Sequence, residues 1–324
     1  MRQCVAHPLD RAEKKRQSIA NQKPATPHEL SSACTVFPAD SESMHQNRAK
    51  HQWAPPGAPA RCPVRTPRGP GQRACPSRDN PLVCSGMDLT PQMLALGMVW
   101  YIAFLFSTTC HEGAHALAAK LGGDPTAALA GQVTLNPIPH VRREPIGMVA
   151  APVISFLWGG WMIGWASAPY DPLWQQRYPR RAALMALAGP LANFTLMLLA
   201  AAGIRAGVAA GALRPPEAVS FTQITEAVEP GVFEFLATLL SVMFALNLLL
   251  GTFNLLPVPP LDGHSVVTLL LPERAALRVL EFAQNSSFAL VGLIVAWQLF
   301  GKIFWPIFLL ALAYLYPEVS YGPG

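Results

Sequence analysis

The sequence contains little charge and, after its first quarter, almost no cysteine. Only 13% of the 324 residues are Asp, Glu, Lys or Arg, while 51% are hydrophobic, a balance at the apolar end of soluble globular proteins. Five of the six cysteines precede residue 87, and none of the five belongs to a C-x-x-C pair. A disulfide framework for the main part of the chain is therefore excluded, and a zinc-finger module is not expected.

Positive charge is concentrated at the N-terminal end. Residues 1–86 contain 13 Lys and Arg against 6 Asp and Glu, and the rest of the chain contains 11 against 13. The net charge of +5 therefore gives no reason to expect a nucleic-acid partner. With 12 prolines and no long apolar stretch, residues 1–86 are predicted to be a disordered tail. Because Met87 leads at once into a hydrophobic run, a native start at Met87 is the alternative.

Long uncharged stretches dominate the second region, residues 87–324. About 20 apolar residues in a helix cross the hydrocarbon core of a bilayer, so most of these stretches can span a membrane. We therefore predict an all-α polytopic membrane protein, because a soluble fold would need a larger polar surface than this region provides. The stretches are Leu89–Cys110, Pro145–Tyr170, Ala182–Ile204, Phe235–Leu261, Phe282–Gly301 and Ile303–Pro317.

The first stretch leads into a possible metal site. His111 and His115 are one helical turn apart, so both imidazoles lie on one face and can bind the same Zn2+. Glu112, next to the first histidine, is predicted to be the catalytic base for a metal-activated water. A chance match is the alternative, but ionisable groups in a spanning helix are costly unless they face a polar interior, which favours a functional site.

A catalytic zinc site requires a third protein ligand. Asp262 is the sole carboxylate of a long apolar stretch and follows the end of a spanning segment. Its alternative role is that of a turn residue before Gly263. We expect one Zn2+ per chain, bound by His111, His115 and Asp262.

Three motifs together resemble the site-2 protease family of zinc intramembrane metalloproteases. They are H-E-G-A-H at 111–115, A-G-P-L-A-N at 188–193 and N-L-L-P-V-P-P-L-D-G at 254–263. Residues 122–140 look like the compact bacterial branch of that family, without a PDZ domain. The resemblance implies a site-2-protease-like helical core with a re-entrant or short β element after the first helix. It also implies the same zinc ligands and the same catalytic base.

The resemblance further suggests roles for two asparagines. Asn254 is expected to contact the substrate backbone or the developing oxyanion, and Asn193 to support a metal ligand from behind. A side chain that bridges two helices is an equal alternative for each. Among the remaining polar residues, His264 is expected at a membrane interface, His140 in solvent, and Cys110 in packing.

The ligand positions constrain the topology. His115 lies near the C-terminal end of its helix, and Asp262 lies just past the end of the Phe235–Phe253 helix, so these two helices must be parallel and an odd number of crossings must separate them. Ala182–Ile204 is one crossing, which makes Pro145–Tyr170 a re-entrant hairpin or a pair of short segments. Residues 120–181 carry six basic residues, and 205–234 carry two among four glutamates. The positive-inside rule then places the zinc toward the cytoplasmic side of a bacterial inner membrane.

The predicted function is zinc-dependent hydrolysis of peptide bonds within the membrane or at its edge, as in regulated intramembrane proteolysis. The expected substrates are single-span membrane proteins in the lipid bilayer, whose backbone must be unwound to be accessible. Residues Gln132, Val133 and Thr134 could form an edge strand that pairs with such a segment. A membrane zinc-binding or metal-transport protein and a catalytically silent scaffold are the alternatives. The sequence predicts no particular oligomeric state.

Overall fold

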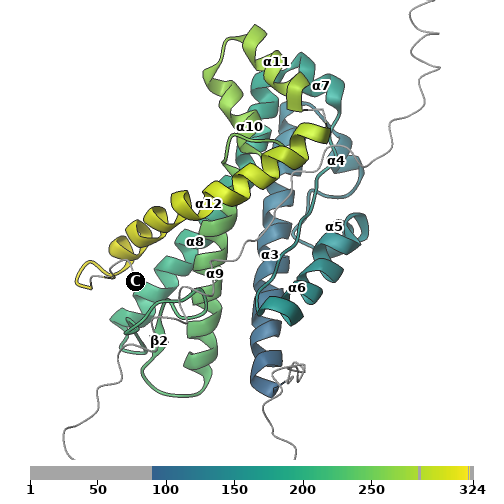
Figure 1. Cartoon of the computed structure of the whole chain (residues 1–324). Coiled ribbons are helices and arrows are strands. Elements are labelled where there is room, and N and C mark those ends of the chain that lie inside the picture. The colour runs from purple at the N-terminus through teal and green to yellow at the C-terminus, as the bar shows by residue number, and fades with distance from the viewer. Residues whose placement is uncertain (1–89, 284–285, 320, 322–324) are drawn as a thin grey trace, which may run out of the picture.

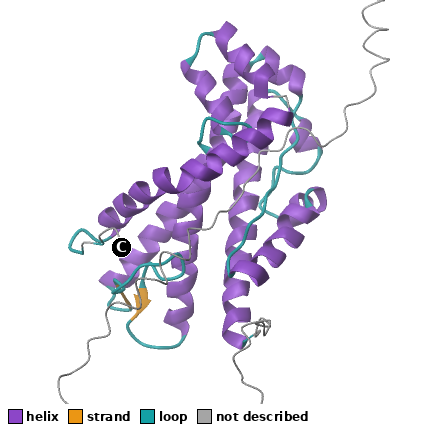
Figure 2. Ribbon diagram, in the orientation of Figure 1, coloured by secondary structure: helices purple, strands orange, loops and turns teal. Residues whose placement is uncertain are grey.

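The computed structural model describes residues 90–283, 286–319 and 321, so the predicted tail 1–86 lies outside the described residues. The described chain is built mainly from helices (Figures 1 and 2). Four of its helices are long and apolar enough to cross a membrane, which confirms the predicted all-α polytopic fold. These helices are α3 (Pro91–Gly122), α8 (Pro179–Ala209), α9 (Val232–Asn254) and α12 (Ser286–Leu315).

Helices α3, α8 and α9 form the core of the molecule. The chain ascends in α3, returns in α8 and ascends again in α9, so α3 and α9 are parallel (Figure 1). Helix α8 packs against both of them, as the predicted single crossing requires. Large side chains of the core helices, such as Phe104, Phe244 and Phe253, are fully buried.

Both ends of α3 are defined by local chemistry. Thr90 caps the N-terminus, where its hydroxyl accepts a hydrogen bond from the Met93 N–H at 3.2 Å. At the other end Gly123 adopts a left-handed conformation with φ 100°, which glycine tolerates best. The carbonyl oxygen of Gly122 accepts hydrogen bonds from Trp174 Nε1 at 3.2 Å and Arg181 Nη1 at 3.1 Å. The final turn of α3 is thus hydrogen-bonded to two side chains that lie 52 and 59 residues further along the chain.

The stretch Pro145–Tyr170 folds back on itself. After a π-helical turn, Ile146–Ala150, and helix α6 (Ala151–Gly159), the chain reverses at Gly160 with φ 76°. The returning segment lies beside the outgoing one, since the Trp165 N–H donates to the Gly147 carbonyl at 3.1 Å. The stretch therefore does not cross as a single span, and this agrees with the re-entrant hairpin or pair of short segments predicted from the sequence. The neighbouring short helices are α4 (Thr126–Leu129), α5 (Pro137–Arg143) and α7 (Pro172–Arg177).

The predicted edge strand at Gln132–Thr134 is wrong, because these residues form a loop. The loop lies close against α3, where a Cβ on Gly113 would come within 3.1 Å of the Thr134 carbonyl oxygen. The same oxygen bonds to His140 Nε2 at 3.2 Å and so cannot be offered freely to a partner strand. The strands of the described chain come after α8 instead, as the antiparallel pair β1 (Leu213–Arg214) and β2 (Glu226–Ala227).

The two predicted stretches on either side of Lys302 form one continuous helix, α12. A single exposed lysine does not break a helix, because its long stem can carry the ammonium group toward a polar region. Between α9 and α12 the chain forms α10 (Gly263–Val266), a 3-10 turn (Val267–Leu270) and the amphipathic helix α11 (Glu273–Ala283).

Candidate active site

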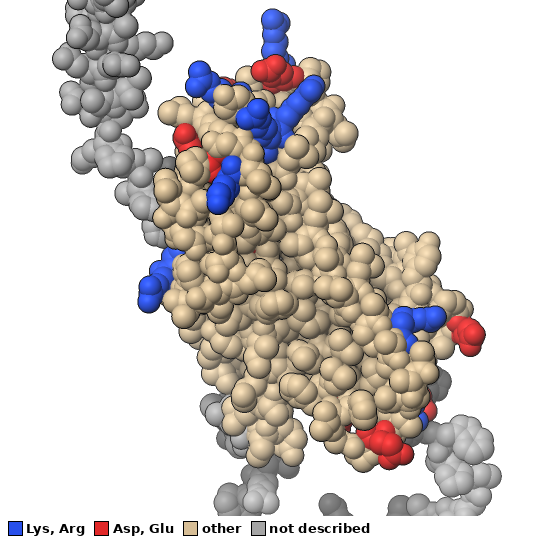
Figure 3. Space-filling view, turned by 180° about the vertical axis from the view of Figure 1, so that it is seen from behind, with Lys and Arg blue, Asp and Glu red and all other residues tan. Residues whose placement is uncertain are grey.

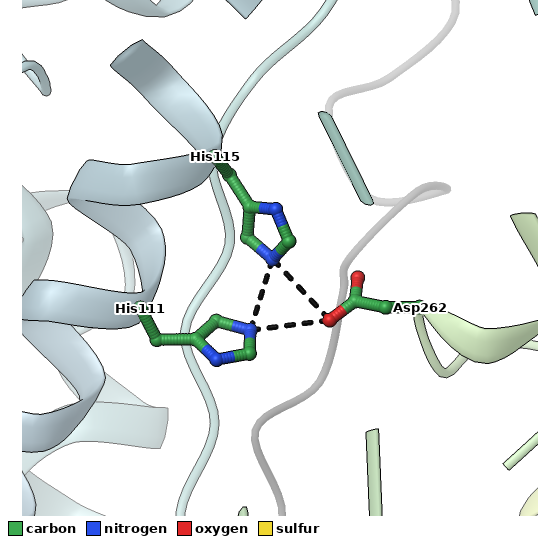
Figure 4. Close-up of side chains that lie close together, drawn as sticks. All are labelled: His111, His115 and Asp262. Carbon is green, nitrogen blue, oxygen red and sulfur yellow. Dashed lines mark hydrogen bonds and ion pairs between the residues drawn. The ribbon is translucent and has the colours of Figure 1, made fainter. Parts of the chain in front are cut away.

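His111, His115 and Asp262 meet at one buried point (Figure 4). The Nε2 atoms of the two histidines are 2.9 Å apart, and Asp262 Oδ2 lies 3.2 Å from His111 Nε2 and 3.3 Å from His115 Nε2. Both histidines are on α3, and the aspartate is the residue that precedes α10. The structure thus brings together the three residues that the sequence predicted as ligands, 151 positions apart at the widest.

The other ring nitrogen of each histidine is held by a hydrogen-bond acceptor. His111 Nδ1 donates to Asn193 Oδ1 at 2.5 Å, and His115 Nδ1 donates to the Met185 carbonyl oxygen at 2.7 Å. Because Nδ1 carries the proton in both rings, both Nε2 atoms present lone pairs to the cluster. Two lone pairs and a carboxylate oxygen at such short distances repel one another unless a cation lies between them.

The distances also fit zinc. In a tetrahedral site with ligand bonds of about 2.0–2.1 Å, ligand atoms are about 3.3 Å apart, close to the three separations observed. Two imidazole nitrogens and one carboxylate oxygen form a ligand set typical of catalytic zinc, which leaves a fourth position for water or substrate. His111, His115 and Asp262 could therefore hold one zinc ion.

Glu112 is fully buried beside this cluster. Neither of its carboxylate oxygens has a hydrogen-bond partner in the described part of the chain. A buried carboxylate without partners is costly, so its retention favours a chemical role over a structural one. Its place next to His111 in the H-E-x-x-H motif makes Glu112 the candidate general base.

Helix α8 approaches the cluster through a glycine. A Cβ at Gly189 would lie 2.3 Å from His115 Nε2 and 2.5 Å from His111 Nε2. Any side chain at this position would therefore fill the space where the ligand atoms converge. The motif A-G-P-L-A-N contains this glycine, but only the asparagine of the motif was predicted to lie at the site.

The two predicted asparagines have different surroundings. Asn193 contacts His111, whereas Asn254 Nδ2 donates to the Leu250 carbonyl oxygen of its own helix at 3.0 Å. The role of Asn254 toward a substrate stays a prediction. Sequence reasoning missed Asn247, a fully buried residue on α9 that accepts a hydrogen bond from Asn193 Nδ2 at 2.9 Å. Its position seven residues before Asn254 in a spanning helix was the available signal.

The remaining polar residues lie around the site. His140 is buried, not exposed as expected, and burial lowers the pKa of its imidazole. Tyr170 ends the returning segment, and burial raises the pKa of its phenol to about 12, so it stays protonated. His264 Nδ1 donates to the Leu261 carbonyl oxygen at 2.5 Å, and Cys110 is half-buried.

A family model described as "Peptidase family M50" matches residues 99–297, which include all three candidate ligands. The chain belongs to peptidase family M50. The resemblance to the site-2 protease family is thereby confirmed, and the chain is an integral membrane protein of a peptidase family.

Two relatives of this chain have names that refer to zinc-dependent proteolysis. The "Putative zinc metalloprotease YwhC" of Bacillus subtilis is 29% identical over 215 residues, which cover 64% of this chain and 84% of that protein. The "Putative zinc metalloprotease Rip2" of Mycobacterium tuberculosis is 31% identical over 232 residues, covering 68% of this chain and 78% of that protein. No solved structure gives a significant match. The names of these relatives and the His111, His115 and Asp262 group agree on zinc.

Proposed function

We propose that this M50 peptidase is a zinc-dependent endopeptidase that cleaves membrane-spanning or membrane-proximal segments of other proteins. The observation that carries the proposal is the unpaired, fully buried carboxylate of Glu112 beside three converging ligand atoms. His111, His115 and Asp262 would hold the metal. When bound, zinc lowers the pKa of water toward about 7 and polarises a substrate carbonyl group.

In this proposal Glu112 moves the proton. One carboxylate oxygen of Glu112 accepts a proton from the water while the water oxygen attacks the scissile carbonyl carbon. The same carboxylic acid then returns the proton to the amine nitrogen as the carbon–nitrogen bond breaks. No side chain of the described residues donates a hydrogen bond to this carboxylate, so both of its oxygens can accept the proton of a water molecule.

The substrate must expose its backbone to reach these groups. In a regular helix each carbonyl oxygen is already hydrogen-bonded, so the proposed substrate is a single-span protein with a locally unwound segment. Asn254, at the C-terminal end of α9 and eight residues before Asp262, is the proposed contact for the substrate backbone or oxyanion.

The proposed orientation places the metal ligands toward the cytoplasm. Lys and Arg gather at the end of the molecule formed by α7 and α11, as Figure 3 shows. His115 lies near the end of α3 that faces this basic region. Cysteine-accessibility mapping at Arg142 and Arg177 tests the orientation, since labelling of both positions from the non-cytoplasmic side would contradict it.

The decisive experiment uses the purified chain in lipid vesicles with a candidate single-span protein. Glu112→Gln is expected to slow cleavage about a hundredfold to ten-thousandfold, the usual contribution of a general base, while zinc remains bound at one ion per chain. Asp262→Ala is the companion variant, and it should lose zinc as well as activity. Cleavage by Glu112→Gln at the parent's rate would overturn the proposed mechanism.

A further inference from the structure

A chain of hydrogen bonds connects His111 to the backbone of α9. His111 Nδ1 bonds to Asn193 Oδ1, and Asn193 Nδ2 donates to Asn247 Oδ1 at 2.9 Å. Asn247 Nδ2 in turn donates to the Met243 carbonyl oxygen at 2.8 Å and to Ser107 Oγ at 2.9 Å. This series of hydrogen bonds connects all three core helices, and the side chains that form it are fully buried.

The order of donors and acceptors along this chain has only one solution. A backbone carbonyl oxygen can only accept, so the Asn247 side that faces Met243 must be its NH2 group. The Asn247 oxygen then faces Asn193 and requires a donor, which places the Asn193 NH2 group there. The Asn193 oxygen is left to face His111, and Nδ1 must carry the proton.

We infer that Asn247 is a positioning residue that sets the tautomer of His111 and thereby keeps its Nε2 lone pair available to the metal. Nothing else in the described chain holds the Asn193 amide in this orientation: without Asn247 the amide could turn and offer its NH2 group to His111 Nδ1. That nitrogen would then be the acceptor and Nε2 would carry the proton, which prevents it from binding zinc.

His115 reaches the same state by a shorter route. Its Nδ1 donates directly to the Met185 carbonyl oxygen on α8, an acceptor that cannot turn around. Main-chain carbonyl groups therefore fix the tautomer of both histidines and leave each Nε2 without a proton. For His115 the carbonyl acts directly, and for His111 it acts through two amide side chains. Only the longer route depends on side chains that a mutation can remove.

The inference rests on the proposed zinc site but is tested by metal affinity, not by proteolysis. Asn247→Leu removes the acceptor for Asn193, and zinc affinity measured by chelator competition should fall about 10- to 100-fold, as for other residues that orient a zinc-bound histidine. Ser241→Ala is the matched control. Ser241 is also fully buried on α9 and accepts hydrogen bonds from Ile224 N and Thr225 N, so its loss should lower stability and leave zinc affinity within about twofold.

A double variant separates positioning from packing. A carboxylate oxygen can only accept, so Asn193→Asp combined with Asn247→Leu should restore the proton to His111 Nδ1 and return zinc affinity to near the parent value. If Asn247 only bridged helices, the double variant would bind zinc no better than Asn247→Leu. Equal losses in Asn247→Leu and Ser241→Ala, or none in Asn247→Leu, would also overturn the inference.

The parent protein offers a test without any substitution. Two-bond proton–nitrogen correlation spectra of the zinc-loaded chain labelled with 15N-histidine report which ring nitrogen carries the proton. A proton on His111 Nδ1 is expected, and metal coordination through Nδ1 would contradict the inference. Zinc affinity can change as described even if no substrate is cleaved, so failure of this inference and failure of the proposed protease are distinguishable.

Discussion

The core helices α3, α8 and α9 and the last helix α12 are both apolar, yet they are packed by different means. The core helices exchange buried polar contacts, such as the bond between Asn193 and Asn247, and approach closely at Gly189. Helix α12 contacts its neighbours through aromatic rings: Phe300 lies 5.0 Å from Phe253 and Phe308 lies 5.6 Å from Phe221, measured between centroids. The difference indicates that polar contacts orient the core helices around the candidate site, whereas α12 is held mainly by apolar packing.

The largest effect is expected at Gly189, where the core helices meet the metal ligands. Gly189→Ala places a methyl group 2.3 Å from His115 Nε2, so the imidazoles must move and zinc affinity should fall more than about a hundredfold. Chelator competition measures the change. Gly203→Ala on the same helix is the control, because its Cβ would meet only the Leu240 side-chain tip at 3.1 Å. Equal zinc affinities in the two variants would refute the crowding argument.

The effect expected in α12 is on stability and, unlike that at Gly189, not on metal binding. Phe308 is buried among Phe304, Trp305 and Phe221, so Phe308→Ala should leave a cavity and lower the free energy of unfolding by about 3–5 kcal/mol. Thermal unfolding in detergent provides the measurement. Zinc affinity of the folded variant should stay within about twofold of the parent value, and a tenfold loss would show that α12 takes part in specifying the metal site.

The smallest effect is expected at the reversal of the Pro145–Tyr170 segment. Gly160 has φ 76°, but a Cβ there would meet no atom within 4 Å, so Gly160→Ala introduces only backbone strain of about 1 kcal/mol. Unfolding measurements should detect a small loss of stability with unchanged zinc binding. A loss as large as that of Phe308→Ala would mean that the turn is more constrained than its geometry indicates.

Much of the fold could be predicted because hydrophobic length and ligand spacing are local properties of the sequence. The runs that became α3, α8 and α9 were visible, and the need to bring Asp262 to His111 and His115 fixed their relative directions. The reversal within Pro145–Tyr170 followed from the same requirement. These features depend on the bilayer dimension and on one metal geometry, both of which are known in advance.

Other features could not be predicted from local sequence patterns. Gln132–Thr134 lies as a loop against Gly113 because of tertiary packing, although its residues are compatible with a strand. The partnership of Asn247 with Asn193 joins two helices whose rotation about their axes was unknown. Lys302 interrupted a hydrophobic run without ending the helix. The first two outcomes were decided by neighbours distant in sequence, whereas Lys302 stays within the helix because its long side chain can carry the ammonium group toward a polar region.

The attachment at the end of α3 limits how this helix can lose its structure. Helices fray from their ends, where carbonyl groups lack partners, but Trp174 and Arg181 anchor the Gly122 carbonyl from the outside. Unravelling from this end would first have to detach α7 and the beginning of α8. We therefore expect heat or detergent to break the hydrogen bonds from Trp174 and Arg181 before unfolding from this end reaches the turn between His111 and His115.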